Sequence, residues 1–267
     1  MSAPWSADFS YACYRRLLDA LSTAFTVHRV EEAPELLART GGRPACLLRH
    51  DVDVALAPAV RMGEIEAEQG IASTYYLLVR SPLYSIEAEA PAIGRLRALG
   101  HEVGLHYDFH GPLDRGAAPT LEAAEAQAAE DCARLEAVLG EPVRSLSFHR
   151  PLAHFLHGPL RVAGRVNAYA RELMGWYLSD SAGRWREGEP LAALAAPRAP
   201  LLQLLTHPVW WAERHRPAPE ALEEFYRGAA RGLAPERARA LDLALAGQLG
   251  VRRSGYDPAI PPTEDAR

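Results

Sequence analysis

The sequence predicts an α/β fold with a parallel sheet, in the form of a barrel or a wound sheet. Two observations point to this class. Short apolar segments alternate along the chain with amphipathic segments, which is the pattern of successive β-α-β units. Histidines and aspartates follow five of the apolar segments, and parallel strands collect their ligand sites at such carboxyl ends.

The helices are predicted from amphipathic spacing and from glycine at their ends. We expect helices at 12–24, 57–69, 91–100 and 121–140, and mostly helical chain from about 217 to 248. Glycine stands at or directly after the end of three of them, as it does at many helix C-caps: Gly70, Gly100 and Gly140.

The strands are predicted from short apolar runs that carry little charge. We expect strands at 45–50, 73–79, 101–106, 143–148, 176–180 and 201–207. The clearest is STYYLLV (73–79), which is aromatic and apolar throughout, whereas ACLLRH (45–50) runs directly into charged residues. A chain of this pattern brings the residues that follow its strands to one edge of the sheet.

The whole chain is expected to form one domain. Its 267 residues suffice for one large core, and we expect a single domain over 1–252, with helical additions at both ends and a loose tail at 253–267. The hydrophobic content of 48% predicts a globular protein. The formal net charge of -5 is spread over mixed charges without a basic stripe, so we expect neither nucleic acid nor an anionic membrane as a partner.

Cysteine usage and the start of the sequence both favour the cytoplasm. Cys13, Cys46 and Cys132 are too far apart in sequence for a metal knuckle or a redox pair. The first residues lack the basic segment and apolar core of a secretory signal. No apolar run approaches the ~20 residues of a membrane span. We therefore expect a soluble, cytoplasmic protein.

Asp51 and Asp53 form an acidic pair at the end of the first predicted strand. Two carboxylates two residues apart point the same way if the strand continues, so one can bind a metal while the other acts as a base. Acidic strand ends are also ordinary, and Asp53 precedes a helix that it could cap. Taken alone, this pair favours the ordinary interpretation.

His106 and His110 stand four residues apart in HYDFH. In a helical turn this spacing places both imidazoles on one face, as in many zinc sites. A loop with two surface histidines is the alternative. With a carboxylate from another strand, the two histidines would form a set that leaves positions open for water and substrate. This set predicts one divalent transition metal, with zinc first and Fe, Mn, Co or Ni as alternatives.

Three further residues suit roles in acid–base chemistry. His207 ends an apolar strand before Pro208, which suits a general acid or, alternatively, a packed strand-end histidine. Arg150 could hold a carboxylate by a bidentate contact, and Asp180 could pair with Arg150, although ordinary ion pairs are commoner. His50 and His149 lie beside functional positions, and we interpret both as supporting residues rather than ligands.

Five motifs in this order resemble the polysaccharide deacetylases, the NodB-homology family of carbohydrate esterases. They are RHDVD (49–53), HYDFH (106–110), HRP (149–151), DSAGRW (180–185) and LTHP (205–208), and the resemblance covers roughly residues 45–210. Each motif is weak alone, but five in the right order make a specific pattern. The resemblance implies a distorted (β/α) barrel of about seven units.

The resemblance also implies a metal-dependent hydrolase. Asp53, His106 and His110 would bind the metal, and Asp51 would be the general base. In this family the metal polarises an amide carbonyl and its bound water, and acetate and a free amine result. One departure is the sequence Asp-Val-Asp, which replaces the usual adjacent pair.

The same resemblance assigns the remaining roles. His207 would be the general acid, Arg150 would orient Asp51, and Asp180 would steady Arg150. Without an export signal, a small substrate fits better than a wall polymer. We expect removal of an acetyl or other acyl group from an N-acylated sugar or related small amine. The alternatives are hydrolysis of another C–N bond, such as a formamide, ureido or cyclic amide, and an inactive barrel that serves as a binding protein.

Overall fold

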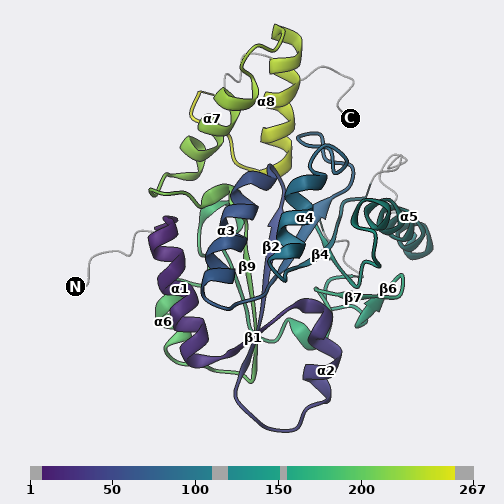
Figure 1. Cartoon of the computed structure of the whole chain (residues 1–267), viewed down its shortest axis with the longest axis vertical. Helices are drawn as coiled ribbons and strands as arrows, with labels where there is room; N and C mark the ends of the chain where they lie inside the picture. Colours follow the sequence, from purple (N-terminus) through teal and green to yellow (C-terminus); the bar gives the residue numbers. More distant parts are fainter. Residues whose placement is uncertain (1–7, 110–119, 151–154, 256–267) are drawn as a thin grey trace.

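The computed structural model describes residues 8–109, 120–150 and 155–255, and it confirms the predicted α/β class. Nine strands form one sheet, which curls into a half-barrel (Figure 1). Seven of them are parallel neighbours in the order β7-β5-β4-β3-β2-β9-β8. At one end β6 pairs with β7 in the antiparallel sense, and β1 runs parallel to the start of β2. This arrangement is the predicted distorted (β/α) barrel.

The strands are short, and most of their residues are buried. Their bounds are β1 Thr26–His28, β2 Ala45–Val52, β3 Thr74–Leu78, β4 Glu102–Tyr107, β5 Ser145–Phe148, β6 Arg161–Val162, β7 Arg165–Asn167, β8 Tyr177–Ser179 and β9 Leu201–Thr206. β2 is an interior strand, because β3 pairs with its second half on one side and β9 with its first six residues on the other. Every residue of β2 after Ala45 is buried.

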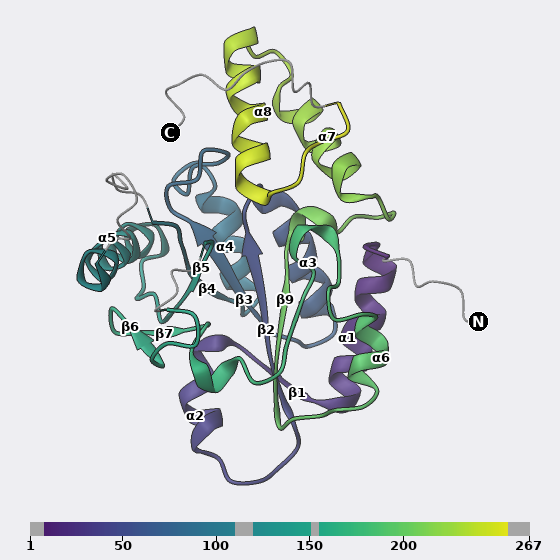
Figure 2. The ribbon, with the colours of Figure 1, turned by 180° about the vertical axis from the view of Figure 1, so that it is seen from behind.

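Helices cover the outer face of the sheet most fully between β2 and β5 (Figures 1 and 2). Their bounds are α1 Tyr11–Ala24, α2 Ala33–Ala38, α3 Leu56–Glu68, α4 Ala90–Ala98, α5 Leu121–Leu139, α6 Pro190–Leu194, α7 Ala218–Ala229 and α8 Pro235–Leu249. α3, α4 and α5 are the crossovers between β2 and β3, β3 and β4, and β4 and β5. Between β5 and β9 the described residues hold a single α-helix, α6, so the described connections on this side of the barrel are largely irregular.

Alternation along β2 separates the inside of the half-barrel from the outside. Leu48 packs in the core cluster that α1 shares, whereas Leu47 packs in a small inner cluster with Tyr76 of β3. Gly104 of β4 makes room for that tyrosine, because a Cβ there would lie 2.5 Å from the Tyr76 ring. The inner face of the sheet therefore holds aromatic and polar side chains close together.

The 3₁₀ helix η1 (Val30–Glu32) closes the amino end of the half-barrel. The backbone N–H of Val30 donates to Thr74 Oγ1 at 2.8 Å, and that of Glu31 donates to Glu102 Oε2 at 3.0 Å. Thr74 Oγ1 also donates to Glu102, at 2.7 Å. Burial raises the pKa of Glu102 to about 7. These contacts tie η1 to the first residues of β3 and β4.

The α7–α8 hairpin extends beyond the carboxyl ends of the strands (Figures 1 and 2). α7 packs against the 3₁₀ helix η4 (Pro208–Trp210), which directly follows β9. Ala221 and Leu222 of α7 and Leu245 of α8 join the largest core cluster. None of the helices in the described part of the chain has the length and apolar character to cross a membrane.

Most ends of the predicted elements lie within one to three residues of the observed ends. The structure also contains several short elements that the sequence did not predict. The added elements are β1, α2, β6, β7, α6 and the 3₁₀ helices, which span two to six residues each. Such segments are too short for a hydrophobic period to repeat. Of the predicted tail at 253–267, residues 256–267 lie outside the described part.

Glu66 of α3 is a fully buried carboxylate that links four segments of the fold. It accepts hydrogen bonds from the hydroxyls of Tyr14 on α1 and Ser73 before β3. His50 Nε2 of β2 lies 2.8 Å from Glu66 Oε1, and His101 Nδ1 lies 3.5 Å from Oε2. Burial opposes the charge of Glu66, but the charge and hydrogen bond of His50 lower its pKa below the ordinary value.

Replacing Glu66 with alanine is expected to cost about 3–5 kcal/mol of unfolding free energy, because buried partners would lose their carboxylate. Glu64→Ala on the same helix is the matched control. Glu64 pairs with the exposed Arg95 at 3.1 Å, so its loss should cost less than about 1 kcal/mol. Denaturant unfolding of the two variants measures the difference. Equal losses would contradict a special role for the buried carboxylate.

Candidate functional site

Strand β2 brings two carboxylates to the carboxyl edge of the sheet. Asp51 lies near the end of β2 and Asp53 directly follows the strand, so both point to the face that Arg49 also occupies. Their residues are only 2% and 4% exposed. Buried carboxylates are costly unless charged or polar groups surround them, so this edge of the sheet must supply such partners.

Two histidines from neighbouring strands meet Asp53. His106, on β4, places Nε2 3.1 Å from Asp53 Oδ1, and His149, directly after β5, places Nδ1 3.1 Å from the same oxygen. Each of the three side chains offers one ligand atom within 4.8 Å of the other two. Burial opposes the charge on Asp53, but the two imidazoles hold its pKa well below the ordinary value.

The chemistry of this donor set fits a divalent transition metal, since two imidazoles and one carboxylate are its usual ligands. Ser147 Oγ lies 3.0 Å from His106 Nδ1 and donates to the Asp51 oxygens at 3.3 Å, so it accepts the Nδ1–H of His106. With its proton on Nδ1, His106 would present the Nε2 lone pair to a metal bound beside Asp53. His149 Nε2 is buried and has no hydrogen-bond partner among the described residues.

His149 is thus the second histidine of this cluster among the described residues. His110 lies outside the described residues, so its predicted role as a ligand stays a prediction. From sequence alone His149 is interpreted as a supporting residue, because it lies beside the predicted functional residue Arg150. The signal that identifies it is topological: β5 is the neighbour of β4, so the residue after β5 lies beside His106.

Asp51 lies beside this cluster with its own set of contacts. Besides the Ser147 hydroxyl, Arg49 Nη2 lies 3.4 Å from Asp51 Oδ2. His106 Nε2 is farther from Asp51 Oδ2, at 3.9 Å, than from Asp53. Asp53 is thus the carboxylate closest to both histidines, and Asp51 is the one beside them, in keeping with a division into ligand and base.

His207 and Asp180 form a second buried pair, which follows the adjacent strands β9 and β8. His207 Nδ1 lies 2.7 Å from Asp180 Oδ1, and the backbone N–H of His207 donates to both carboxylate oxygens, at 2.9 and 3.1 Å. Trp211 Nε1 donates to Asp180 Oδ2 at 2.9 Å. The other imidazole nitrogen, His207 Nε2, faces Asp53 Oδ2 at 3.9 Å. The pair therefore adjoins the cluster at Asp53.

Electrostatics in this pair favour a protonated imidazole. Burial lowers the pKa of His207, but the hydrogen bond and charge of Asp180 raise it more, and with Asp53 and Asp51 bring it to about 9. A protonated His207 that donates through Nδ1 to Asp180 keeps Nε2–H directed at the site. This is the arrangement that a general acid requires.

Arg150 does not make the contact predicted for it. Its guanidinium Nε donates to Asp108 Oδ1 at 3.0 Å, Nη2 donates to Asp108 Oδ2, and its side chain is 67% exposed. The predicted contact of Asp180 with Arg150 is likewise replaced by the contact with His207. The reason is direction: Arg150 comes two residues after β5 ends and points toward solvent, whereas His149 turns inward.

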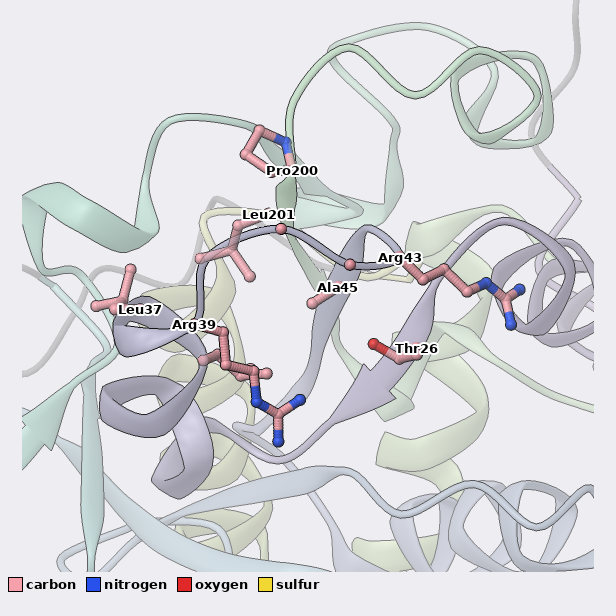
Figure 3. Close-up of a pocket in the computed structure, with 10 residues that line it drawn as sticks. Thr26, Leu37, Arg39, Arg43, Ala45, Pro200 and Leu201 are labelled. Carbon is pink, nitrogen blue, oxygen red and sulfur yellow. The ribbon is translucent and has the colours of Figure 1, made fainter.

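Two cavities differ in their relation to this cluster. A small one of about 60 Å³ borders His106 and is lined by Arg80, Asp108 and Asp131 as well as apolar residues. A larger one of about 400 Å³ lies at the amino ends of β2 and β9, next to α2 (Figure 3). The guanidinium of Arg43, at its rim, donates to backbone carbonyls at the end of α1. The larger cavity lacks the convergent acids and imidazoles found at the carboxyl edge.

Comparison with known proteins finds similar solved structures only at low identity. No family model and no curated protein matches the chain. A CE4 family pseudoenzyme from Bacillus anthracis is 16% identical over 70% of this chain and 60% of its own, with a TM-score of 0.40. The chain thus spans less than two thirds of that protein's length.

Two further structures are similar at the same level. The peptidoglycan deacetylase PdaC from Bacillus subtilis is 16% identical over 77% of this chain and 95% of its own, with a TM-score of 0.37. IcaB from Ammonifex degensii is 20% identical over 58% of this chain and 77% of its own, also with a TM-score of 0.37. The solved structures similar to this chain thus include a CE4 family pseudoenzyme and a peptidoglycan deacetylase.

The pKa of His207 is open to direct measurement in the metal-free protein. We expect the His207 imidazole to titrate near pH 9 and Asp180→Asn to bring it to or below the ordinary value of about 6.5. The raised pKa stabilises the fold fully below about pH 6.5, and this contribution is lost as the pH rises through about 9. Histidine NMR titration of both proteins tests this, and the same His207 pKa in both would contradict it.

Proposed function

We propose that the protein is a metal-dependent hydrolase that removes an acetyl or other acyl group from an N-acylated sugar or related small amine. One observation carries this proposal. Asp53, His106 and His149 lie together at the carboxyl edge of the sheet, and both Asp51 and the His207–Asp180 pair adjoin them. A candidate metal site, base and acid within one cluster are the parts that amide hydrolysis by water requires.

Asp53, His106 and His149 are the described residues that would hold the metal. A bound divalent ion would act as a Lewis acid toward the substrate carbonyl and lower the pKa of water. Whether His110 is a further ligand stays a prediction. Zinc remains the first expectation, and Fe, Mn, Co and Ni suit the same ligands.

The chain's own residues account for the protons of the reaction. Asp51 accepts a proton from the attacking water, and Arg49 and Ser147 hold its carboxylate while it does so. His207 donates its Nε2 proton to the leaving amine, so the C–N bond breaks to give a neutral amine and a carboxylic acid, which then releases its proton to solvent and leaves as the carboxylate. Asp180 keeps the His207 ring oriented through Nδ1.

Two alternatives share part of this chemistry. Hydrolysis of a formamide, ureido or cyclic amide would use the same residues, and the product distinguishes it: formate or ring opening in place of acetate. An inactive binding barrel would not need acid, base and metal ligands together, which is why we favour an enzyme. The expected cytoplasmic location stays a prediction, and with it the preference for a small substrate.

Metal content is the first test. We expect about one equivalent of a divalent transition metal in the purified wild-type protein and its loss in His106→Ala and His149→Ala. His28→Ala on β1, at the opposite edge of the sheet, is the matched control and should keep the metal. Elemental analysis with unfolding curves for each variant measures this. A wild-type protein that holds no metal after reconstitution would contradict the proposal.

Asp51→Asn separates the base from the ligands. We expect the variant to keep its metal and to lose hydrolysis of N-acetyl sugars by roughly 10²–10⁴-fold in kcat, because it can no longer accept the proton. Acetate release is the measurement, beside elemental analysis of the same samples. Loss of the metal in Asp51→Asn would instead assign Asp51 to the ligands.

A further inference from the structure

Arg49 is a fully buried arginine on the inner face of β2, two residues before Asp51. We infer that Arg49 is the positioning residue that holds the Asp51 carboxylate in place for hydrolysis, the role that the sequence had predicted for Arg150. This inference rests on the proposed function and deepens it. It follows from the geometry of the guanidinium and from what surrounds it.

Alternation along the strand makes the contact possible. Residues two apart in a strand point to the same face, so the side chains of Arg49 and Asp51 lie side by side inside the half-barrel. Arg49 Nη2 lies 3.4 Å from Asp51 Oδ2, and the two side chains are 0% and 3% exposed. Water therefore does little to screen this pair, unlike an ion pair at the surface.

The surroundings of Arg49 leave Asp51 as its counterion. The guanidinium carbon lies 4.5 Å from the ring centroid of Tyr169 and 5.7 Å from that of Tyr76, so aromatic faces cover it. Its Nε and Nη1 have no hydrogen-bond partner among the described residues. Of the carboxylates that the structure describes, Asp51 is the one that pairs with Arg49.

The Arg150 guanidinium is placed differently. It is 67% exposed and pairs with Asp108, whose side chain is 22% exposed. An exposed pair of this kind can exchange with water, and it fixes a carboxylate weakly. A fully buried arginine held between two tyrosine rings has little freedom, so it defines where the Asp51 oxygen lies.

Ser147 and Arg49 then divide the contacts of Asp51 between them. Ser147 Oγ lies 3.3 Å from each Asp51 oxygen and links Asp51 to His106, whereas Arg49 approaches Oδ2 from the strand that carries Asp51. The Ser147 hydroxyl thus aligns the Asp51 carboxylate with His106, and the Arg49 guanidinium holds the same carboxylate by its charge. A displaced base would lose the alignment with the attacked carbonyl.

A double-mutant cycle in unfolding tests the contact without reference to activity. The variants are Arg49→Met, Asp51→Asn and their combination, compared by denaturant unfolding. Each single change leaves one buried partner uncompensated, so the effects should not multiply. If the two single effects were independent, they would multiply in the unfolding equilibrium constant. We expect the measured constant of the double variant to be at least about tenfold smaller than that product. The parallel cycle of Arg150→Met with Asp51→Asn should show no such coupling.

Kinetics and metal content of the same variants test the role. We expect Arg49→Met to lower kcat by roughly 10²-fold while KM stays within about threefold and the metal is retained. Arg49→Lys, which keeps the charge, should recover at least about tenfold of that loss. Arg165→Met on β7, whose arginine pairs with Glu136 at 2.9 Å, is the matched control and should keep the wild-type kcat.

The outcomes separate this inference from the proposed function. Coupling between positions 49 and 51 in a metal-binding wild type that hydrolyses no acylated amine would support the contact and overturn the proposed reaction. Absence of coupling would overturn the inference, whatever the activity. A wild-type kcat in Arg49→Met, or a larger loss in Arg150→Met than in Arg49→Met, would also overturn it.

Discussion

The burial of ionisable side chains on both faces of β2 is the constraint on which the rest of the structure depends. A central strand normally carries apolar residues alone, because ionised groups lose their hydration there. β2 instead buries Arg49 and Asp51 on its inner face and His50 on its outer face. Asp53, which directly follows the strand, is also buried on the inner side. Each of these needs a partner of opposite charge or a hydrogen bond from another element, so the neighbouring elements must supply them.

The partners come from several elements around the strand. Glu66 on α3 meets His50 outside the sheet, and Thr206 on β9 bonds the other nitrogen of the same ring at 2.7 Å. Inside, β4 and the residue after β5 supply the imidazoles for Asp53. The register of β2 is therefore specified strongly, because a slip by one residue would exchange the two sets of partners. The same contacts that hold the strand also orient the residues proposed for catalysis.

The sequence predicted the main strands and helices, because these follow from the hydrophobic period. It also predicted that the site lies at the carboxyl edge of the sheet, because its residues directly follow the predicted strands. It predicted Asp53 and His106 as neighbours and His207 beside them, because strand ends in a parallel sheet converge. It could not predict that His149 turns inward and Arg150 outward, since adjacent residues after a strand differ only in the direction of the loop. Nor did the sequence indicate that Arg49 is buried, because an arginine is ordinarily expected at a surface.

The order of the strands divides the site into two parts that share β2. The imidazoles of His106 and His149 come from β4 and β5 on one side of β2, whereas Asp180 and His207 come from β8 and β9 on the other. Under the proposed function, substitution on the β8–β9 side would remove proton donation and spare ion binding. If the proposed function holds, a chain of this kind would become a receptor through changes on the β8–β9 side alone, because the scaffold and the candidate ligands on the other side would remain.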